Sequence, residues 1–569
     1  MDKKSIPEYL APITPILLLF WEKFEEWISE QLYERILSQA EKEEVVRLRE
    51  CVNFEGLTAA CAGYHQQGGR GRPVKHGVRQ LVRVLFLRWY GNHSLRETEA
   101  QVRYHLLYRW FAGYGLYAKT VDHNTLHEFE KYVMEKQERL FFDTILQQID
   151  ESLPQERERV QVGDTFAVLA DAALESLIKR LRHSSWRLLQ AVKKEKPGAY
   201  ERVVESVDEL LLGRQKKEKL ECYLDKEAWL ERLRVTVNEV QQCLTLVGKE
   251  ELKSPWVAYW VANCEKIIAD ELDVGVTESG EVHSVTLLPS KKRGSYRICG
   301  ASDPEATIRK HGKKKEDFGY NVSVATTKNI IREIQADTGS QPDSVAIPDL
   351  LHRQQQHHEL VPESFVYDQI AGTGKTAAEV EAVSKGKTEL IAKPMPYAKR
   401  SKKLGPRDCT LAEDGLALTC PGGEISRRKY RSGSGEGYIF RFHHIQCVGC
   451  PFLQACRGNE KLPTKKREFF ISDYQAHYLQ LVNASQTEDF KQKMKLRPQV
   501  ERVIAGLVRH NGARRARFRG TKKVDFQMKM CAMAYNVKRW LKLLDSPIPA
   551  TLPDDRPPPT RPSAAVTVA

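Results

Sequence analysis

The chain contains the stretch Arg497-Pro-Gln-Val-Glu-Arg-Val-Ile-Ala-Gly-Leu-Val-Arg-His-Asn-Gly512, which predicts a helix with one acid in its first turn. Pro498 suits the first helical position, where a backbone N–H is not needed, and Asn511-Gly512 is typical of a helix end. Apolar residues at helical spacing predict a buried stripe: Val500, Val503, Ile504 and Leu507. Glu501 lies off this stripe. It either complements the positive end of the helix dipole or meets carboxylates from elsewhere in the chain.

An excess of basic residues indicates a polyanionic partner. The 569 residues include 89 Lys and Arg against 75 Asp and Glu, which gives a formal net charge of +14. Residues 70–79, 393–407 and 509–523 form basic blocks without an acid. Clustered positive charge of this kind is typical of nucleic-acid binding. The length allows roughly three or four domains.

The twelve cysteines bear on the compartment of the protein. The sequence begins Met1-Asp-Lys-Lys, without the pattern of a secretory leader, and the apolar run 13–21 is too short to span a bilayer. We therefore expect a soluble cytoplasmic protein, whose thiols are free or bind a metal.

The first 150 residues read as helical. Residues 16–48 predict a pair of packing or dimerisation helices. The segment 68–74, Gly-Gly-Arg-Gly-Arg-Pro-Val, is either a basic arm for a DNA minor groove or a basic linker. Three further helices are predicted at 78–90, 95–112 and 126–140, and they form either a helix-turn-helix-like DNA-binding unit or a plain helical bundle.

The pattern changes to strands after residue 157. Residues 160–170 alternate with period two, and Asp164 lies in the middle of this predicted strand. Aspartate is disfavoured in strands, so Asp164 is either solvated at an edge or needed by a site. Strands and helices then alternate, which predicts an α/β sheet with Asp368 at a strand end. The expected strands lie at 282–288, 321–326, 330–336, 364–368 and 389–392, and the expected helices at 344–358 and 376–383.

Two segments interrupt this sheet. Residues 174–280 have helical apolar spacing with charged outer faces and predict an all-α insertion. Residues 397–485 are basic and contain five cysteines: Cys409, Cys420, Cys447, Cys450 and Cys456. The Cys447-x2-Cys450 spacing favours a structural zinc site, completed by Cys456 and either Cys409 or Cys420; the alternative is a set of buried free thiols.

Two short motifs bear on phosphate binding. Gly372-Thr-Gly-Lys-Thr376 lacks the first glycine of a P-loop, because that position is Gln369, so a nucleotide site is not predicted there. Asp303 precedes Pro304 and lies upstream of Arg309. This segment either borders a phosphate-binding surface or is only a turn.

Asp164 and Asp368 at strands, with Glu501 on a later helix, form a constellation of three carboxylates. Carboxylate oxygens are the ligands that Mg²⁺ prefers, and two such ions can activate an attacking hydroxyl and stabilise a leaving 3′ oxygen. The order and spacing resemble the DDE transposases of bacterial insertion sequences, whose core is ribonuclease-H-like. The resemblance extends over most of the chain, through Arg103-Tyr-His-Leu-Leu-Tyr-Arg-Trp-Phe111, Asp122-His-Asn-Thr-Leu126, Asp164-Thr165, Gly319-Tyr-Asn321, Tyr367-Asp368 and Ala534-Tyr-Asn-Val-Lys-Arg-Trp540.

The family signature around its glutamate is Y-x2-R-x3-E-x6-K. Arg497 and Glu501 match it, whereas Met494 stands at the tyrosine position and Val508 at the lysine position, with Arg509 beside it. The chain is therefore a divergent member by this resemblance. The departures leave the three carboxylates untouched.

The resemblance implies a transposase that binds terminal inverted repeats and carries out metal-dependent DNA cleavage and strand transfer. Asp164, Asp368 and Glu501 would bind two Mg²⁺ or Mn²⁺ ions, and the protein would act on double-stranded DNA as a homodimer, near the bacterial nucleoid. The implied DNA contacts are Arg497, Arg509, Arg514, Arg515, Arg517, Arg519, Arg70 and Arg72. Two other classes stay open: a metal-dependent nuclease without strand transfer, and a non-catalytic DNA-binding protein derived from a transposase.

The expected domain organisation follows from these patterns. It comprises a helical N-terminal DNA-binding or dimerisation region (1–150), a ribonuclease-H-like core (157–173, 281–396 and 486–546), a helical insertion (174–280), a basic Cys-rich insertion (397–485) and a disordered Pro-rich tail (547–569).

Overall fold

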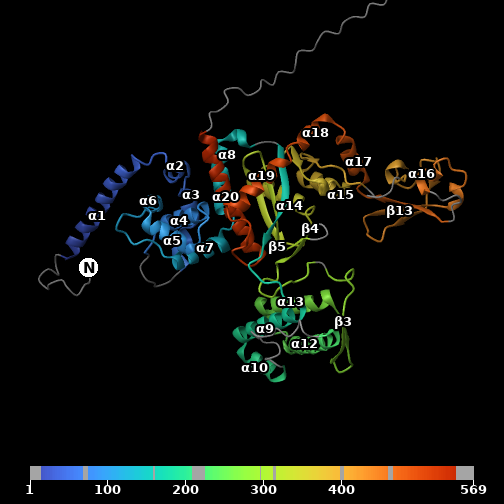
Figure 1. Cartoon of the computed structure of the whole chain (residues 1–569), viewed down its shortest axis with the longest axis horizontal. Helices are drawn as coiled ribbons and strands as arrows, with labels where there is room; N and C mark the ends of the chain where they lie inside the picture. Colours follow the sequence, from blue (N-terminus) through green and yellow to red (C-terminus); the bar gives the residue numbers. More distant parts are fainter. Residues whose placement is uncertain are drawn as a thin grey trace, which may run out of the picture.

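The structure is a computed structural model, and it describes residues 14–67, 75–157, 160–207, 225–294, 296–311, 315–396, 403–458 and 465–545. A central sheet and its helices lie in the middle of the molecule (Figure 1). In this view the N-terminal helices lie to the left of this core and the Cys-rich part lies to the right. The helical insertion, which contains α9 (Leu177–Glu195) to α13 (Pro255–Glu271), lies below the core. Within the described ranges, every helix is too short or too polar to cross a lipid bilayer.

The central sheet has six strands, and its strand directions are mixed. The strands are β1 (Val160–Leu169), β4 (Thr307–His311), β5 (Lys315–Thr326), β6 (Ile331–Thr338), β7 (Ser364–Val366) and β8 (Glu389–Ile391). The main path is β4-β5-β1-β7-β8, and β6 also pairs with β5. β5 is antiparallel to β1 and β6, whereas β7 and β8 run parallel to β1. This mixed α/β arrangement is compatible with a ribonuclease-H-like core.

Helices cover the sheet and join it to the N-terminal region. They are α8 (Leu140–Ser152), α14 (Ala346–His358), α15 (Gly374–Ser384), α19 (Pro498–His510) and α20 (Thr521–Asp545). Helix α20 lies against β6, where Asn536 accepts from the Ile331 N–H at 2.8 Å and donates to the Ile331 carbonyl at 2.9 Å. One hydrophobic core runs continuously from the N-terminal helices through α20 to the sheet.

The N-terminal region is helical, as the sequence predicts. It contains α1 (Thr14–Leu37), α2 (Glu44–Cys51), α3 (Glu55–Ala60), α4 (Val78–Tyr90), α5 (Leu95–Tyr104), α6 (Leu106–Ala112) and α7 (His123–Lys136). The single helix expected at 95–112 is wrong, because the chain breaks at His105. This residue has an extended backbone, and its ring accepts from the Tyr108 N–H and so caps α6.

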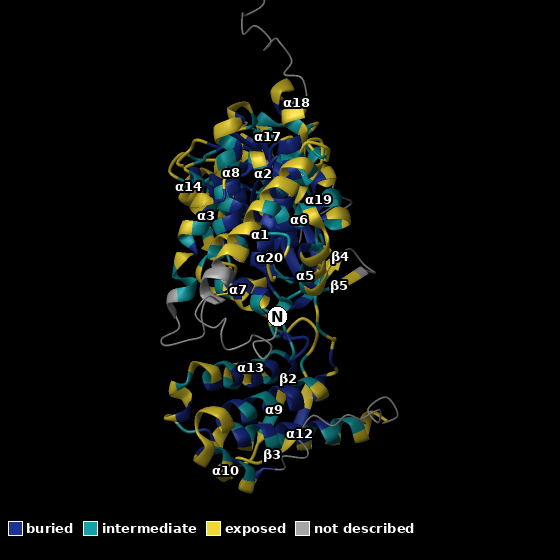
Figure 2. Cartoon of the chain, turned by 90° about the vertical axis from the view of Figure 1, so that its left-hand side faces the viewer, coloured by how far each residue is buried: buried dark blue, intermediate teal, exposed yellow. Residues whose placement is uncertain are grey.

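The helical insertion has a hydrophobic core of its own (Figure 2). Its elements are α9 (Leu177–Glu195), α10 (Pro197–Ser206), α12 (Lys226–Leu246), α13 (Pro255–Glu271), β2 (Leu272–Val276) and β3 (Val282–Leu287). The strand predicted at 282–288 exists, but it pairs with β2 rather than with the central sheet. Ile298 and Ala301 also belong to the insertion core, so the insertion continues beyond residue 280.

The Cys-rich part consists of two small sheets of three strands each. They are built from β9 (Thr410–Leu411), β10 (Leu418–Thr419), β11 (Ile425–Ser426), β12 (Lys429–Arg431), β13 (Gly437–Phe442) and β14 (Arg467–Ser472), with the short helix α16 (Leu453–Arg457). The chain then returns through α17 (Gln475–Ala484) and α18 (Glu488–Met494). Helix α17 packs against α15, so it belongs with the core rather than with the Cys-rich sheets.

Candidate active site

Asp164 and Asp368 lie side by side where the parallel pair of β1 and β7 ends. Val162 of β1 pairs with Val366 of β7, and β7 ends at that residue. Each aspartate stands two residues further along its chain, so continuation of the same register brings them to adjacent positions. β1 continues along β5, where Asp164 pairs with Val324. The aspartate is tolerated inside β1 because the strand is no longer paired on its β7 side.

Backbone N–H groups orient one oxygen of each aspartate. Asp164 Oδ1 accepts from the Thr165 N–H at 2.8 Å. Asp368 Oδ1 accepts from the Ile370 N–H at 3.0 Å, which caps the short turn Gln369–Ala371. Each carboxylate therefore keeps its second oxygen, Oδ2, for another partner.

Arg497 links Glu501 to this pair. Its guanidinium lies 3.6 Å from Asp164 Oδ2 and, through its other terminal nitrogen, 3.6 Å from Glu501 Oε1. Of the predicted apolar stripe of α19, Val500, Val503 and Leu507 are buried and Ile504 is partly buried. Glu501 lies off this stripe, and 60% of its side chain is exposed. Helix α19 packs against β1 and β5, which places its first turn near the aspartates.

The electrostatics of the two aspartates reflect their closeness. Burial raises the pKa of the Asp164 carboxyl. The charges of Asp368 and Asp343 raise this pKa further, while the Thr165 N–H and Arg497 lower it. The pKa of Asp368 is also raised, first by burial and then by Asp343. The site therefore concentrates negative charge, which Arg497 partly neutralises.

Asp343 and Tyr367 lie beside this site but were not predicted as site residues, although Tyr367 belongs to the motif Tyr367-Asp368. Asp343 follows β6, accepts from Asn321 Nδ2 at 2.8 Å and lies 3.3 Å from Arg309. It lies in the turn between β6, which ends at Thr338, and α14, which begins at Ala346. The only signal that could have found it is its place beyond the carboxyl end of a strand, where carboxylates commonly line sites in α/β sheets. Tyr367 is fully buried, and its hydroxyl has no hydrogen-bond partner within the described ranges. Burial raises the pKa of Tyr367, and the charges of Asp164 and Asp343 raise it further.

Two of the carboxylates fit a divalent cation by their chemistry. In the part of the chain that the structure describes, no group of three or more His, Cys, Asp or Glu side chains is arranged to hold a metal ion. Asp164 and Asp368 nevertheless offer two close carboxylates whose repulsion a cation would relieve. The buried Tyr367 hydroxyl beside them is a further oxygen that the described residues leave unsatisfied. Glu501 joins these residues only through Arg497.

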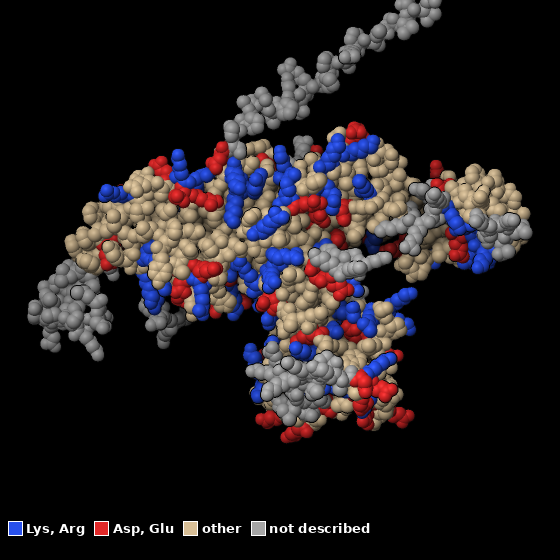
Figure 3. All heavy atoms as spheres, in the orientation of Figure 1, with Lys and Arg blue, Asp and Glu red and all other residues tan. Residues whose placement is uncertain are grey.

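The basic segment after α19 runs beside the end of β1. Leu169 N–H donates to the Arg514 carbonyl at 3.0 Å, and Ala516 N–H donates to the Leu169 carbonyl at 2.8 Å. The side chains of Arg514 and Arg515 are exposed. Arg509, in the last turn of α19, and Arg519 are exposed as well. Lys and Arg side chains are prominent over the central part of the molecule in Figure 3.

Not every predicted DNA contact is directed outward. Arg517 donates to the carbonyls of His93 at 3.2 Å and Asn92 at 3.3 Å, and its guanidinium lies over the Trp89 ring. It therefore holds the N-terminal helices against the core. Arg70 and Arg72 lie outside the described residues.

The predicted zinc site is not supported. Cys420, Cys447, Cys450 and Cys456 line a cavity of about 30 Å³. Burial and, after it, the neighbouring Cys420 raise the pKa of Cys409 to about 12. The described ranges include all five cysteines. Within these ranges, no group of three or more His, Cys, Asp or Glu side chains is arranged to hold a metal ion. Cys409, Cys420 and Cys456 instead pack beside a small apolar cluster that contains Phe440.

Comparison with known families gives two matches. A family described as "Transposase DDE domain" matches residues 419–541, and one described as "Transposase domain (DUF772)" matches residues 32–132. The first match contains α19 and α20 with Arg497 and Glu501, and the second contains most of the N-terminal helices. Comparison with curated proteins and with solved structures finds no match. These two family matches support an insertion-sequence DDE transposase.

Proposed function

We propose that this protein binds the terminal inverted repeats of its insertion sequence and catalyses metal-dependent DNA cleavage and strand transfer with Asp164, Asp368 and Glu501. The observation that carries the proposal is the register of β1 and β7, which sets the two aspartates at adjacent strand positions. The contact of Arg497 with both Asp164 and Glu501 supports a common site. The order of the central sheet supports a ribonuclease-H-like core.

The carboxylates of this site would hold Mg²⁺ or Mn²⁺. Asp164 and Asp368 would contribute the Oδ2 atoms, because their Oδ1 atoms are held by backbone N–H groups. Glu501 would complete the set. Two bound ions would supply activation of water or a DNA 3′-hydroxyl and stabilisation of the leaving oxygen.

Arg497 is proposed to position the phosphodiester. Its guanidinium is 33% exposed and has donors in the fork geometry that matches phosphate oxygens. It now contacts the carboxylates that would bind metal, so the binding of cations there would free these donors for the DNA backbone. The role is one of holding and orienting the substrate.

The protein is proposed to act as a homodimer, because the two DNA ends of the insertion sequence must be brought together. Helix α1 supports it. This helix extends away from the other N-terminal helices (Figure 1), and it exposes four aromatic side chains: Phe20, Trp21, Phe24 and Trp27. Exposed apolar stripes of this kind mark protein interfaces.

The arginines after α19 are proposed to hold the DNA backbone. In the variant Arg514→Ala/Arg515→Ala, two exposed cations are lost, and the salt dependence of DNA binding is expected to fall by about 2 in the slope of log K against log salt. The measurement is a binding titration at several salt concentrations. Arg427→Ala/Arg428→Ala, a second exposed arginine pair in the Cys-rich part, is the matched control. Equal slopes for both variants would contradict the assignment.

A joining assay tests the proposed function directly. The full chain is incubated with a duplex made from the DNA that flanks the gene, together with a supercoiled plasmid as target. We expect Mg²⁺- or Mn²⁺-dependent nicks at the element end and covalent joining of that end to the plasmid, both abolished by EDTA. Cleavage without joining would indicate the nuclease class instead. Specific binding without any metal-dependent cleavage would indicate the non-catalytic class.

A further inference from the structure

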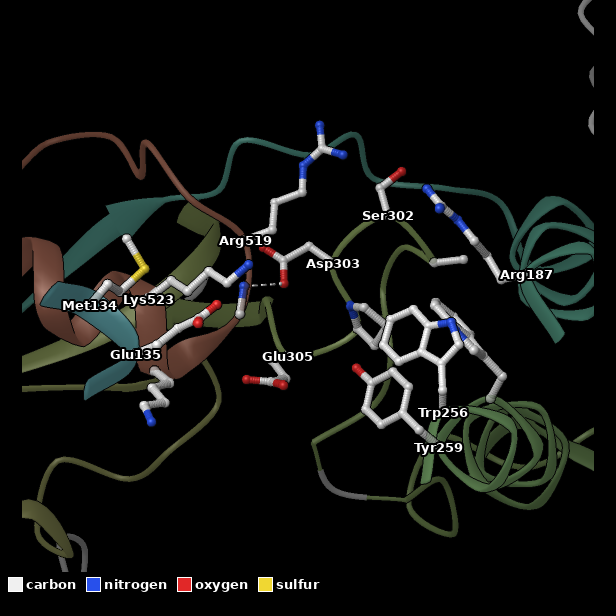
Figure 4. A pocket seen from close by; sticks show the side chains of 15 residues that line it. Met134, Glu135, Arg187, Trp256, Tyr259, Ser302, Asp303, Glu305, Arg519 and Lys523 are labelled. Carbon is white, nitrogen blue, oxygen red and sulfur yellow. Dashed lines mark hydrogen bonds between the residues drawn. The ribbon is translucent and has the colours of Figure 1, made fainter. Parts of the chain in front are cut away.

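A cavity of about 410 Å³ lies between the helical insertion and the core, away from the candidate carboxylates. Helix α13 contributes one wall with Trp256, Tyr259 and Trp260. The opposite wall is formed by the loop 301–305 and by residues at the start of α20 (Figure 4). The two walls differ in chemistry, since one is aromatic and the other charged.

The aromatic wall presents a flat ring that is open to a ligand. Trp256 and Tyr259 are stacked, with ring centroids 5.8 Å apart and planes 5° apart. Trp260 meets both rings edge-on and is buried, and its Nε1 has no hydrogen-bond partner within the described ranges. Trp256 is 49% exposed, so about half of this large apolar side chain is accessible from the cavity side or from solvent. Trp260 belongs to the insertion core and Tyr259 packs against it, which leaves Trp256 as the accessible aromatic side chain of this wall.

The opposite wall carries cations, and its nearest acids are engaged by the protein. Two of the cations also belong to exposed ion pairs: Arg519 lies 3.6 Å from Asp171 and Lys522 lies 3.7 Å from Glu138. Arg519, Lys522 and Lys523 line this wall, and Arg187 lines the aromatic side. Asp303 accepts from the Tyr320 hydroxyl and from the Gly520 N–H. Glu305 accepts from the Thr521 N–H at 2.6 Å. These bonds satisfy Asp303 and Glu305 at the start of α20. Glu135 also lines the cavity and is exposed.

A flat aromatic surface opposite cations fits one chemical class well. Single-stranded nucleic acid is bound by stacking its bases on aromatic rings and by pairing its phosphates with Lys and Arg. A base inside a duplex has both faces covered by its neighbours, so this surface would select an unpaired one. The cavity volume lies in the range of sites that hold small organic ligands.

The cavity adjoins the arginine-rich segment that is proposed to bind DNA, because Arg519 of that segment lines it. Arg519 belongs to the arginine-rich segment that runs beside the end of β1, and its Nε donates to the Asp171 carbonyl at 2.8 Å. From Asp164 to Leu169 the strand advances about 17 Å. DNA held at the carboxylates and along the arginines would thus reach the cavity within a few nucleotides.

We propose that this cavity binds an unpaired nucleotide of the DNA substrate, with its base on Trp256 and its phosphate toward Arg519 and Lys523. The inference rests on the proposed function only in taking DNA as the substrate. It adds a binding site, formed jointly by the insertion and the core, that prefers DNA with a single-stranded end or an extruded base.

The test compares two DNA probes with the full-length protein. One is a blunt 20-base-pair duplex of arbitrary sequence, and the other is the same duplex with a three-nucleotide 3′ overhang that contains 5-iododeoxyuridine. Trp256→Ala is expected to weaken binding of the overhang duplex about 5- to 150-fold, which corresponds to the loss of one stacked base. Binding of the blunt duplex is expected to stay unchanged. Photocrosslinking of the overhang should label Trp256 or Tyr259.

Matched variants keep the test decisive. Tyr430→Ala removes an aromatic side chain of similar exposure, 47%, from the Cys-rich part and should change the affinity for neither probe. Trp256→Phe keeps an aromatic ring and should retain most of the overhang preference. Equal loss for both probes, or crosslinks confined to residues outside the cavity, would overturn the proposal. The assay needs no cleavage, so the overhang preference can hold even if the joining assay fails, and the reverse also applies.

Discussion

Replacement of Asp164 by Asn is expected to lower the rate of DNA cleavage by about 10³-fold or more and to leave DNA binding intact. The amide keeps the size of the side chain and can still accept from the Thr165 N–H, but it removes the negative charge beside Asp368. A metal ion supplies several kcal/mol of transition-state stabilisation, and each 1.36 kcal/mol is about tenfold in rate. The measurement is single-turnover cleavage of the end duplex in Mg²⁺, with binding followed in parallel in Ca²⁺.

The control for this variant is Asp273→Asn. Asp273 is also a strand aspartate, but it is exposed on β2 of the insertion. Its replacement should leave both cleavage and binding at the parent level. If Asp164→Asn cleaves as fast as the parent protein, Asp164 has no part in the mechanism.

Replacement of Glu130 by Ala is expected to lower the free energy of unfolding of the N-terminal region by about 3–5 kcal/mol. Glu130 is 1% exposed, pairs with the buried Arg88 and accepts from Trp89 Nε1 at 2.9 Å. Without Glu130, the Arg88 cation would remain buried without its partner carboxylate. Burial already lowers the pKa of Arg88, and the charge of Glu130 counters that effect. Hydrogen exchange of the α4 and α7 amides measures the loss locally.

Two further variants separate the charge from the packing. Glu128→Ala removes an exposed glutamate of the same helix and should change stability by no more than about 0.5 kcal/mol. Arg88→Met/Glu130→Leu removes both charges together and should recover most of the lost stability, because no buried charge is left alone. A double variant as unstable as Glu130→Ala would show that packing, rather than the buried charge, dominates.

Local structure followed closely from local sequence. The helix predicted around Glu501 runs from Pro498 to His510, with its apolar stripe buried. The strand with Asp164 and the later alternation of strands and helices are also confirmed. These elements depend on side-chain periodicity and on turn residues within a few positions, which the sequence displays directly. The break at His105 was missed, because a histidine ring that caps a helix has no periodic signature.

Pairings between segments that lie far apart in the chain were harder to predict from the sequence. The strand at Val282–Leu287 has the same alternation whether it joins the central sheet or the hairpin with β2, and it joins the hairpin. Arg517 reads like its neighbours in the basic run, yet it binds the carbonyls of Asn92 and His93. The close cysteine spacing suggested a zinc site that the structure does not support. Each outcome depends on a partner that lies far away in the chain.

The sequence by itself determined the local elements, the positions of the three candidate carboxylates and the family resemblance, which the family matches bear out. Only the tertiary structure decided that Asp164 and Asp368 are neighbours, that Arg497 joins Glu501 to them, and that Asp343 and Tyr367 lie beside the same site. It also created the aromatic and basic cavity from α13 and the start of α20. The reason is physical: helical and strand periods act over a few residues, whereas strand register and helix docking are set by the packing of segments far apart in the chain.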